Sequence, residues 1–245
     1  MKISKFFLLF VFVSFLLFSC KNNTVNDSHL IGSPSGNISV NFFLDKDGAP
    51  AYTVEHSEEL IIDTSFMSFE FKDATPFKTG FEITEIEELA IEDEWEMPWG
   101  EQRIVKNNYN ESVFLLTEKD DPKRSLKIYF RAYDDGVAFR YEFLEQGGTD
   151  SLIITDENTE FNLTGDHTCW WIPGDWDIYE HLYSETKFTE INAIGRRLQA
   201  IESGLAQTHI PENAVNTPVT MRTASGLHLS FHEANLTDYA GMTLK

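Results

Sequence analysis

The chain has 245 residues, and 40 Asp and Glu outnumber 19 Lys and Arg to give a formal net charge of −21. Aromatic residues make up 13% of it, which indicates a folded domain, because a disordered chain of this acidity would be poor in Phe and Trp. The negative charge argues against a nucleic-acid partner, since phosphate binding requires clustered Lys and Arg. Two Cys exclude a disulfide framework. A cation, a neutral polar ligand or a sugar remains open.

The first segment of the chain, residues 1–19, has the pattern of a secretory signal peptide. Two lysines precede an almost continuously apolar run from Phe6 to Phe18. This run is shorter than the roughly 20 residues of a membrane span. Cys20 directly follows Ser19 and resembles the cysteine of a bacterial lipobox, which implies cleavage before Cys20 and acylation of its thiol. A plain signal peptide with an incidental Cys is the alternative.

Residues 20–35 are polar and rich in turn-forming residues, so we expect a tether between the anchor and a folded domain. The anchor places the protein in the periplasm or at the outer membrane. The folded domain is expected to span residues 36–245 and to continue beyond Lys245, because the last residues still read as strand.

Alternation with a period of two dominates the folded part and predicts antiparallel strands. Asp134-Asp135-Gly136 separates two alternating runs, which is a strong hairpin signal because Gly accepts the positive φ of the turn. Further hairpins are expected around 45–48 and 224–226, and shorter strands at 59–62, 66–71, 81–91, 113–117, 152–155 and 160–163. Residues 192–203 form the one candidate helix, which Gly195 weakens. Many short strands joined by turns indicate an all-β fold, a large antiparallel β-sandwich.

Familiar catalytic motifs are missing from the sequence. There is no GxGxxG, GxxxxGK[ST] or GxSxG string, and His232-Glu233 lacks the second His of HExxH because position 236 is Leu. Cys169 is interpreted as a buried small apolar side chain rather than a nucleophile.

Aromatic side chains gather in one window, because all five Trp lie within residues 95–176. Residues 169–183 combine Trp, Tyr, Asp and His in a segment broken by Pro173 and Gly174, and such side chains suit a sugar ligand. The alternative is that Trp170 and Trp171 straddle a strand, with one ring in the core. By composition alone, Glu180 is a solvated surface acid.

Several short strings together resemble the N-terminal domain of glycoside hydrolase family 97. Their order and spacing span roughly residues 31–245, at Ser33–Gly36, Trp99–Glu101, Tyr109–Glu111, Phe130–Tyr141, Glu160–Phe161, Trp170–Trp171, Tyr179–Glu180, Thr217–Thr220 and His232–Met242. Each string alone is weakly specific.

The resemblance implies the N-terminal super-sandwich, of galactose-mutarotase-like type, of an exo-acting α-glycosidase common in Bacteroides-type bacteria. Members of the family act on α-linked glucosides or galactosides, with inversion or retention, through carboxylates on a (β/α)8 barrel. That barrel is absent from these 245 residues, so we expect the domain to be inactive alone and to pack on its own barrel in a longer protein.

The resemblance also implies site residues. A Glu of the sandwich reaches the calcium ion of the family's active site, and Glu180 is the best match, with Glu233 second. Trp170, Trp171, Trp176 and Tyr179 are the candidate substrate-binding residues. The alternative function is a lipid-anchored, non-catalytic glycan-binding protein that uses the Trp cluster.

Overall fold

The computed structural model describes residues 28–145, 151–176, 179–204 and 210–245. The predicted signal peptide and the lipidation site at Cys20 lie outside the described residues. In these ranges the structure contains no helix of the length and apolarity that a membrane crossing requires.

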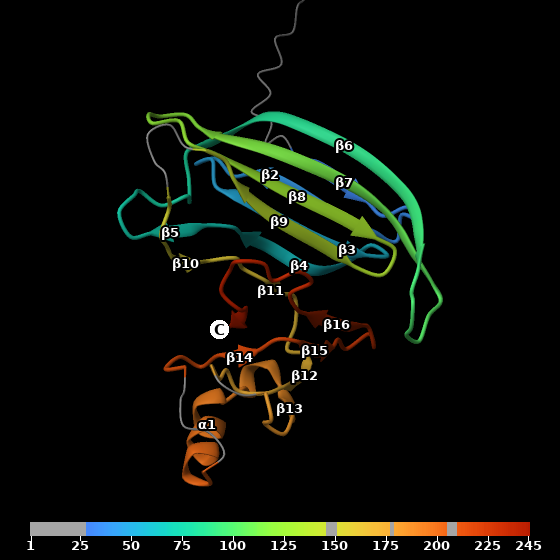
Figure 1. Cartoon of the computed structure of the whole chain (residues 1–245), viewed down its shortest axis with the longest axis vertical. Coiled ribbons are helices and arrows are strands. Elements are labelled where there is room, and N and C mark those ends of the chain that lie inside the picture. The colour runs from blue at the N-terminus through green and yellow to red at the C-terminus, as the bar shows by residue number, and fades with distance from the viewer. Residues whose placement is uncertain (1–27, 146–150, 177–178, 205–209) are drawn as a thin grey trace, which may run out of the picture.

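One layer of the fold is a five-stranded antiparallel sheet in the order β1-β2-β3-β4-β11 (Figure 1). Its strands are β1 (His29–Gly32), β2 (Ile38–Leu44), β3 (Pro50–His56), β4 (Glu59–Phe66) and β11 (Asn162–Leu163). The turn between β2 and β3 forms as predicted: Asp45 Oδ1 accepts the N–H groups of Asp47 at 2.9 Å and Ala49 at 2.8 Å. Gly48 in this turn has φ +75°, and a Cβ there would lie 2.6 Å from the Phe81 carbonyl oxygen.

The start of this sheet corrects the expected tether boundary. Residues 29–32 pair with β2 as strand β1, so the sandwich begins before residue 36. The physical reason is that Ile31 points inward and is buried, which a polar composition averaged over residues 20–35 conceals.

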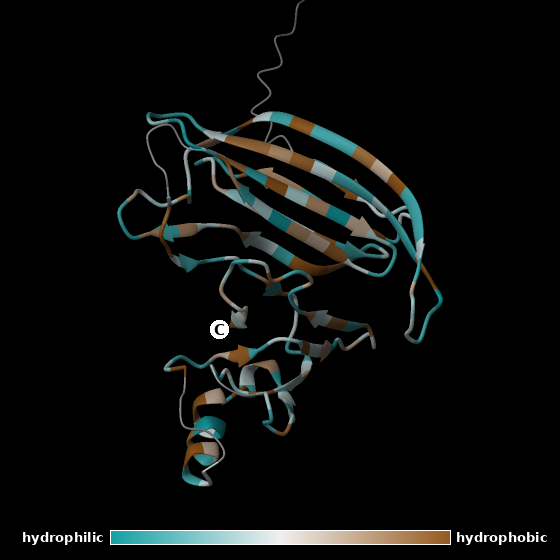
Figure 2. Ribbon diagram, in the orientation of Figure 1, coloured by the Kyte–Doolittle hydropathy of each residue, from teal (hydrophilic) through white to brown (hydrophobic). Residues whose placement is uncertain are grey.

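The facing layer is a four-stranded sheet, β6-β7-β8-β9, that arches over the first (Figure 1). It contains β6 (Phe81–Glu96), β7 (Ile104–Glu118), β8 (Ser125–Tyr133) and β9 (Val137–Phe143), and a short pair of β5 (Phe69–Phe71) with β10 (Ile154–Glu157) lies beside it. Ala132 and Val137 are opposite each other across the predicted Asp-Gly turn, and Tyr133 donates its N–H to the Gly136 carbonyl at 2.8 Å. Figure 2 shows the resulting alternation of apolar and polar segments along β7 and β8.

The core between the two layers is rich in phenylalanine. Phe42 of β2 and Phe114 of β7 are fully buried, with ring centroids 4.4 Å apart. Phe130 of β8 adds a third buried ring, 5.5 Å from Phe42. Many of the aromatic side chains of this chain lie in this core, and the packing of the two layers confirms the prediction of an all-β sandwich.

A smaller lobe, formed by strands β12 to β17 and helix α1, lies below the sandwich in Figure 1. Its sheet has the order β13-β12-β15-β16, formed by β12 (Thr168–Trp171), β13 (Ser184–Lys187), β15 (Val219–Arg222) and β16 (His228–Phe231). β14 (Val215–Asn216) pairs with β17 (Thr243–Leu244), and the lobe also holds the 3-10 turn η1 (Phe188–Glu190) and helix α1 (Ala193–Glu202). Leu229 and Phe231 pack against both the sandwich core and the core of this lobe, so the two cores are continuous.

The doubtful helix exists, and Gly195 helps to begin it. Asn192 is the N-cap of α1, and its Oδ1 accepts the N–H of Gly195 at 2.9 Å. A Cβ at position 195 would lie 2.7 Å from Nδ2 of Asn192. Glycine therefore leaves room for the capping side chain, a local reason that its low helix propensity does not reveal.

Candidate functional site

The tryptophan pair of β12 straddles its strand. Trp171 is 1% exposed in the core of the small lobe, and its Nε1 donates to Thr186 Oγ1 at 2.9 Å. Because successive side chains of a strand point to opposite faces, Trp170 lies on the outer face. The structure thus corrects the interpretation of Trp171 as a substrate-binding residue, since its ring is enclosed by protein.

Trp170 is partly covered by polar neighbours on the same face of the sheet. Its Nε1 donates to Glu185 Oε2 at 3.1 Å, and the Arg222 guanidinium lies 5.5 Å from its ring centroid. The His228 ring is nearly parallel to the indole at 6.3 Å. These contacts occupy much of the indole, so Trp170 is a cross-strand packing residue more than an open stacking platform.

The connection from β12 to β13 presents the most exposed group of apolar side chains in the small lobe. Trp176 and Tyr179 are both 69% exposed, and Leu182 and Tyr183 are also exposed. Solvent-exposed clusters of large apolar side chains are typical of contact surfaces. Trp176 and Tyr179 therefore remain candidate contact residues, although no described ring contact joins them to Trp170.

Two buried polar side chains hold the ends of this exposed segment together. His181 Nε2 lies 3.0 Å from Asp175 Oδ2, and the two side chains are 5% and 0% exposed. A carboxylate only accepts, so the imidazole N–H donates to it. Asp175 also bonds to Asn216 of β14 through its backbone. The Asp175 N–H donates to Asn216 Oδ1, and Asn216 Nδ2–H donates to the Asp175 carbonyl, both at 3.4 Å.

A buried arginine lies in the same lobe. Arg197 of α1 is 2% exposed and donates through Nη2 to the Glu212 carbonyl at 2.8 Å, while its Nε and Nη1 have no hydrogen-bond partner among the described residues. Burial lowers the pKa of this guanidinium, and the charges of Glu212 and Asp175 oppose that shift. Sequence reasoning missed Arg197 and Asn216. The Asp and His of the segment were visible in sequence, but nothing local indicated that they pair.

The two candidate metal ligands differ in their surroundings. Glu180 is exposed between Tyr179 and the buried His181, and no described residue bonds to its carboxylate. Glu233 is already engaged, because its Oε2 accepts the N–H of Met242 at 2.8 Å. A calcium ion takes six to eight oxygens, and a free carboxylate suits it as one ligand. No cluster of three or more His, Cys, Asp or Glu that could hold a metal occurs in the described ranges, so further ligands would have to come from elsewhere.

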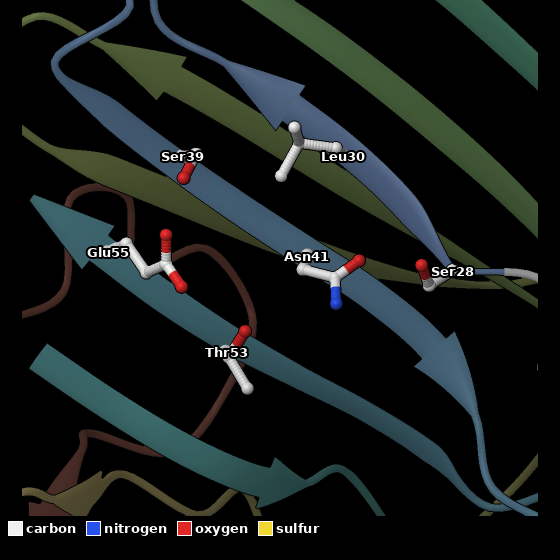
Figure 3. A pocket seen from close by; sticks show the side chains of 6 residues that line it. All are labelled: Ser28, Leu30, Ser39, Asn41, Thr53 and Glu55. Atoms are coloured by element: carbon white, nitrogen blue, oxygen red, sulfur yellow. The ribbon is translucent and has the colours of Figure 1, made fainter. Parts of the chain in front are cut away.

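A shallow depression of about 250 Å³ lies on the outer face of β1, β2 and β3 (Figure 3). It is lined by small and polar side chains with one carboxylate, from Ser28, Leu30, Ser39, Asn41, Thr53 and Glu55. It has no aromatic ring and lies in a different sheet from the tryptophan pair. The candidate site is therefore the described part of the connection between β12 and β13, residues 172–176 and 179–183.

The family model described as Glycosyl-hydrolase 97 N-terminal matches residues 31–245. The chain belongs to this family. The match confirms the resemblance seen in the short sequence strings, and it covers both the sandwich and the small lobe.

Solved structures agree with this membership. A glycoside hydrolase family 97 enzyme from Pseudoalteromonas sp. strain K8, in complex with panose, matches with 32% identity and a TM-score of 0.75 over 88% of this chain and 30% of that chain. The same enzyme in complex with acarbose matches equally well. A β-arabinopyranosidase shares the fold at 18% identity and a TM-score of 0.64. The family 97 domain described here thus spans about a third of the length of the enzymes that it resembles.

Proposed function

We propose that this domain is the N-terminal sandwich of an exo-acting α-glycosidase, in which it supports a (β/α)8 barrel and supplies Glu180 as a calcium ligand. The substrate class is α-linked glucosides or galactosides. The observation that carries the proposal is the position of Glu180, an exposed carboxylate without a described partner, close in sequence to the exposed side chains of Trp176 and Tyr179.

Two further observations support this function. The relatives from Pseudoalteromonas bind carbohydrate ligands and are about three times longer than the matched region, which leaves room for a catalytic part. A calcium ion can bind oxygens from two parts of a protein at once. Glu180 would supply one of its six to eight ligands, and the catalytic part would supply others. The secretory signal and a lipid anchor at Cys20 belong to the same proposal, and incorporation of labelled palmitate that is lost in Cys20→Ala would test them.

The test compares two glutamates in the full-length gene product. Glu180→Gln keeps the side-chain shape and removes the charge, so we expect calcium affinity, measured by calorimetric titration, to fall at least about tenfold. Glu233→Gln is the matched control, because the amide oxygen can still accept the Met242 N–H, and its calcium affinity should change little. Hydrolysis of aryl α-glucosides and α-galactosides is followed in parallel.

Unchanged calcium affinity in Glu180→Gln would exclude the metal-ligand role. A gene product that hydrolyses neither glycoside, yet shows saturable quenching of Trp fluorescence with oligosaccharides, would favour the glycan-binding alternative. The enclosure of Trp171 and the partial cover of Trp170 argue against that alternative, because they leave little of this tryptophan pair accessible to a sugar.

A further inference from the structure

We infer that Asp175 and His181 are positioning residues that hold Glu180 in place for its ligand. This inference rests on the proposed function, because it concerns how Glu180 is presented. The two residues are not ligands themselves: their side chains are buried and bonded to each other, whereas the Glu180 side chain is exposed.

The pair is a buried polar link within the segment that carries Glu180. Trp176, Tyr179, Leu182 and Tyr183 all project into solvent, so their side chains make few packing contacts that could order the backbone. The bond from His181 to Asp175 joins positions six residues apart. Fixing residue 181 also fixes the peptide that it shares with Glu180, so the bond restricts the Glu180 backbone directly.

Asp175 is itself anchored to the frame of the small lobe. Immediately before it, the Gly174 N–H donates to the Ala214 carbonyl at 2.7 Å, and the Asn216 N–H donates to the Ile172 carbonyl at 3.2 Å. The side chain of Asn216 hydrogen-bonds to both the N–H and the carbonyl of Asp175. A continuous series of contacts therefore runs from β14 through Asp175 and His181 to the residue beside Glu180.

Such a series matters for metal binding because calcium requires its oxygens at 2.3–2.6 Å. A carboxylate on a loosely held backbone would lose conformational freedom when it binds, and that loss weakens affinity. Hydrogen bonds that orient a metal-binding side chain typically change metal affinity by about 10–100-fold when they are removed. We expect the Asp175–His181 pair to contribute in this range.

The experiment uses the full-length gene product and calcium alone as the probe. His181→Ala removes the bond, and calcium affinity measured by calorimetric titration should fall about 10–100-fold. His181→Gln should restore most of the affinity, because the Gln amide nitrogen is as many bonds from the backbone as Nε2 of His and can donate to Asp175. Thr186→Val is the control for stability: it removes the hydrogen bond from Trp171 in the same lobe and should leave calcium affinity unchanged.

Thermal unfolding in excess chelator distinguishes positioning from general destabilisation. If His181→Ala does not fold, His181→Phe keeps a ring in the buried position without the donor, and its calcium affinity decides the question. A folded variant that binds calcium like the wild type, while Glu180→Gln binds weakly, overturns the positioning role alone. Wild-type affinity in Glu180→Gln overturns the proposed function instead. Equal losses in His181→Ala, His181→Gln and Thr186→Val would also overturn the inference, because they would reflect stability only.

Discussion

At the residue scale, Cys169 shows how burial decides chemistry. Its side chain is fully buried in the small lobe, with Sγ 3.5 Å from the His167 carbonyl oxygen. Desolvation raises the pKa of the thiol from 9.0 to about 11, and the nearby Asp166 charge acts in the same direction. The thiolate is the reactive form, so Cys169 is poorly suited to nucleophilic chemistry at neutral pH.

We predict that Cys169 reacts slowly with an aromatic disulfide reagent at pH 8 in the folded protein and rapidly after unfolding in guanidinium. A Cys20→Ser background leaves this single thiol to be followed by absorbance. Rapid reaction of the folded protein would contradict the burial of Cys169.

The same pKa shift links Cys169 to stability. The folded thiol keeps its proton up to about pH 11 while the unfolded thiol releases it near pH 9, so the unfolded state binds fewer protons in this window. The free energy of unfolding should therefore fall as pH rises from 9 to 11. Cys169→Ala should show a smaller fall in denaturant titrations at these pH values, and an equal fall would assign the effect to other groups.

At the scale of elements, the start of α1 depends on one capping side chain and one glycine. Asn192→Ala should cost about 0.5–2 kcal/mol of unfolding free energy, because the Gly195 N–H loses its acceptor. Gly195→Ala would normally stabilise a helix by about 1 kcal/mol, yet here the added Cβ meets the Asn192 side chain at 2.7 Å.

We predict that Gly195→Ala fails to stabilise the wild type but stabilises the Asn192→Ala variant. A double-mutant cycle of denaturant midpoints measures this coupling. Independent, additive effects of the two substitutions would show that the cap and the glycine do not interact.

The edge strand β6 is longer than the sequence periodicity predicted. Eight acidic residues lie along it, and most of its side chains are exposed on both faces. Charged side chains on an edge strand discourage pairing with other chains. They also break the alternation of apolar and polar residues, so β6 was expected to end at 91 although it runs to Glu96.

At the scale of the whole molecule, the net charge of −21 opposes the compact state. At 0.1 M ionic strength, salt largely screens the repulsion between exposed charges that lie more than about 10 Å apart. We predict that the thermal midpoint rises by about 2–4 °C between 20 mM and 500 mM NaCl, which corresponds to about 1 kcal/mol for a chain of this size.

Differential scanning calorimetry over this salt series checks the prediction. Replacing exposed Glu92 and Glu94 with Gln removes two negative charges and should reduce the gain from salt. A midpoint that falls as NaCl increases would mean that attractive ion pairs outweigh the repulsion.

Both the fold and the family could be predicted from local patterns, whereas the site could be predicted only in part. The turn at Asp134–Gly136 and the straddling tryptophans follow from a period of two and need no knowledge of distant segments. Glu180 was named through the family resemblance, and the structure adds that its carboxylate has no described partner. Trp171 was misassigned because an alternating pattern does not say which of two faces meets the core.

The sequence by itself determined an acidic, aromatic-rich β-sandwich, because strand periodicity and turn residues are local properties, and its short strings resemble glycoside hydrolase family 97, to which the chain belongs. Only the tertiary structure decided which tryptophan is enclosed and which polar groups meet. Asp175 and Asn216 are 41 positions apart, and they come together because β14 crosses beside the segment that follows β12. Such convergence depends on how separate elements pack on a shared core, and no local pattern encodes it.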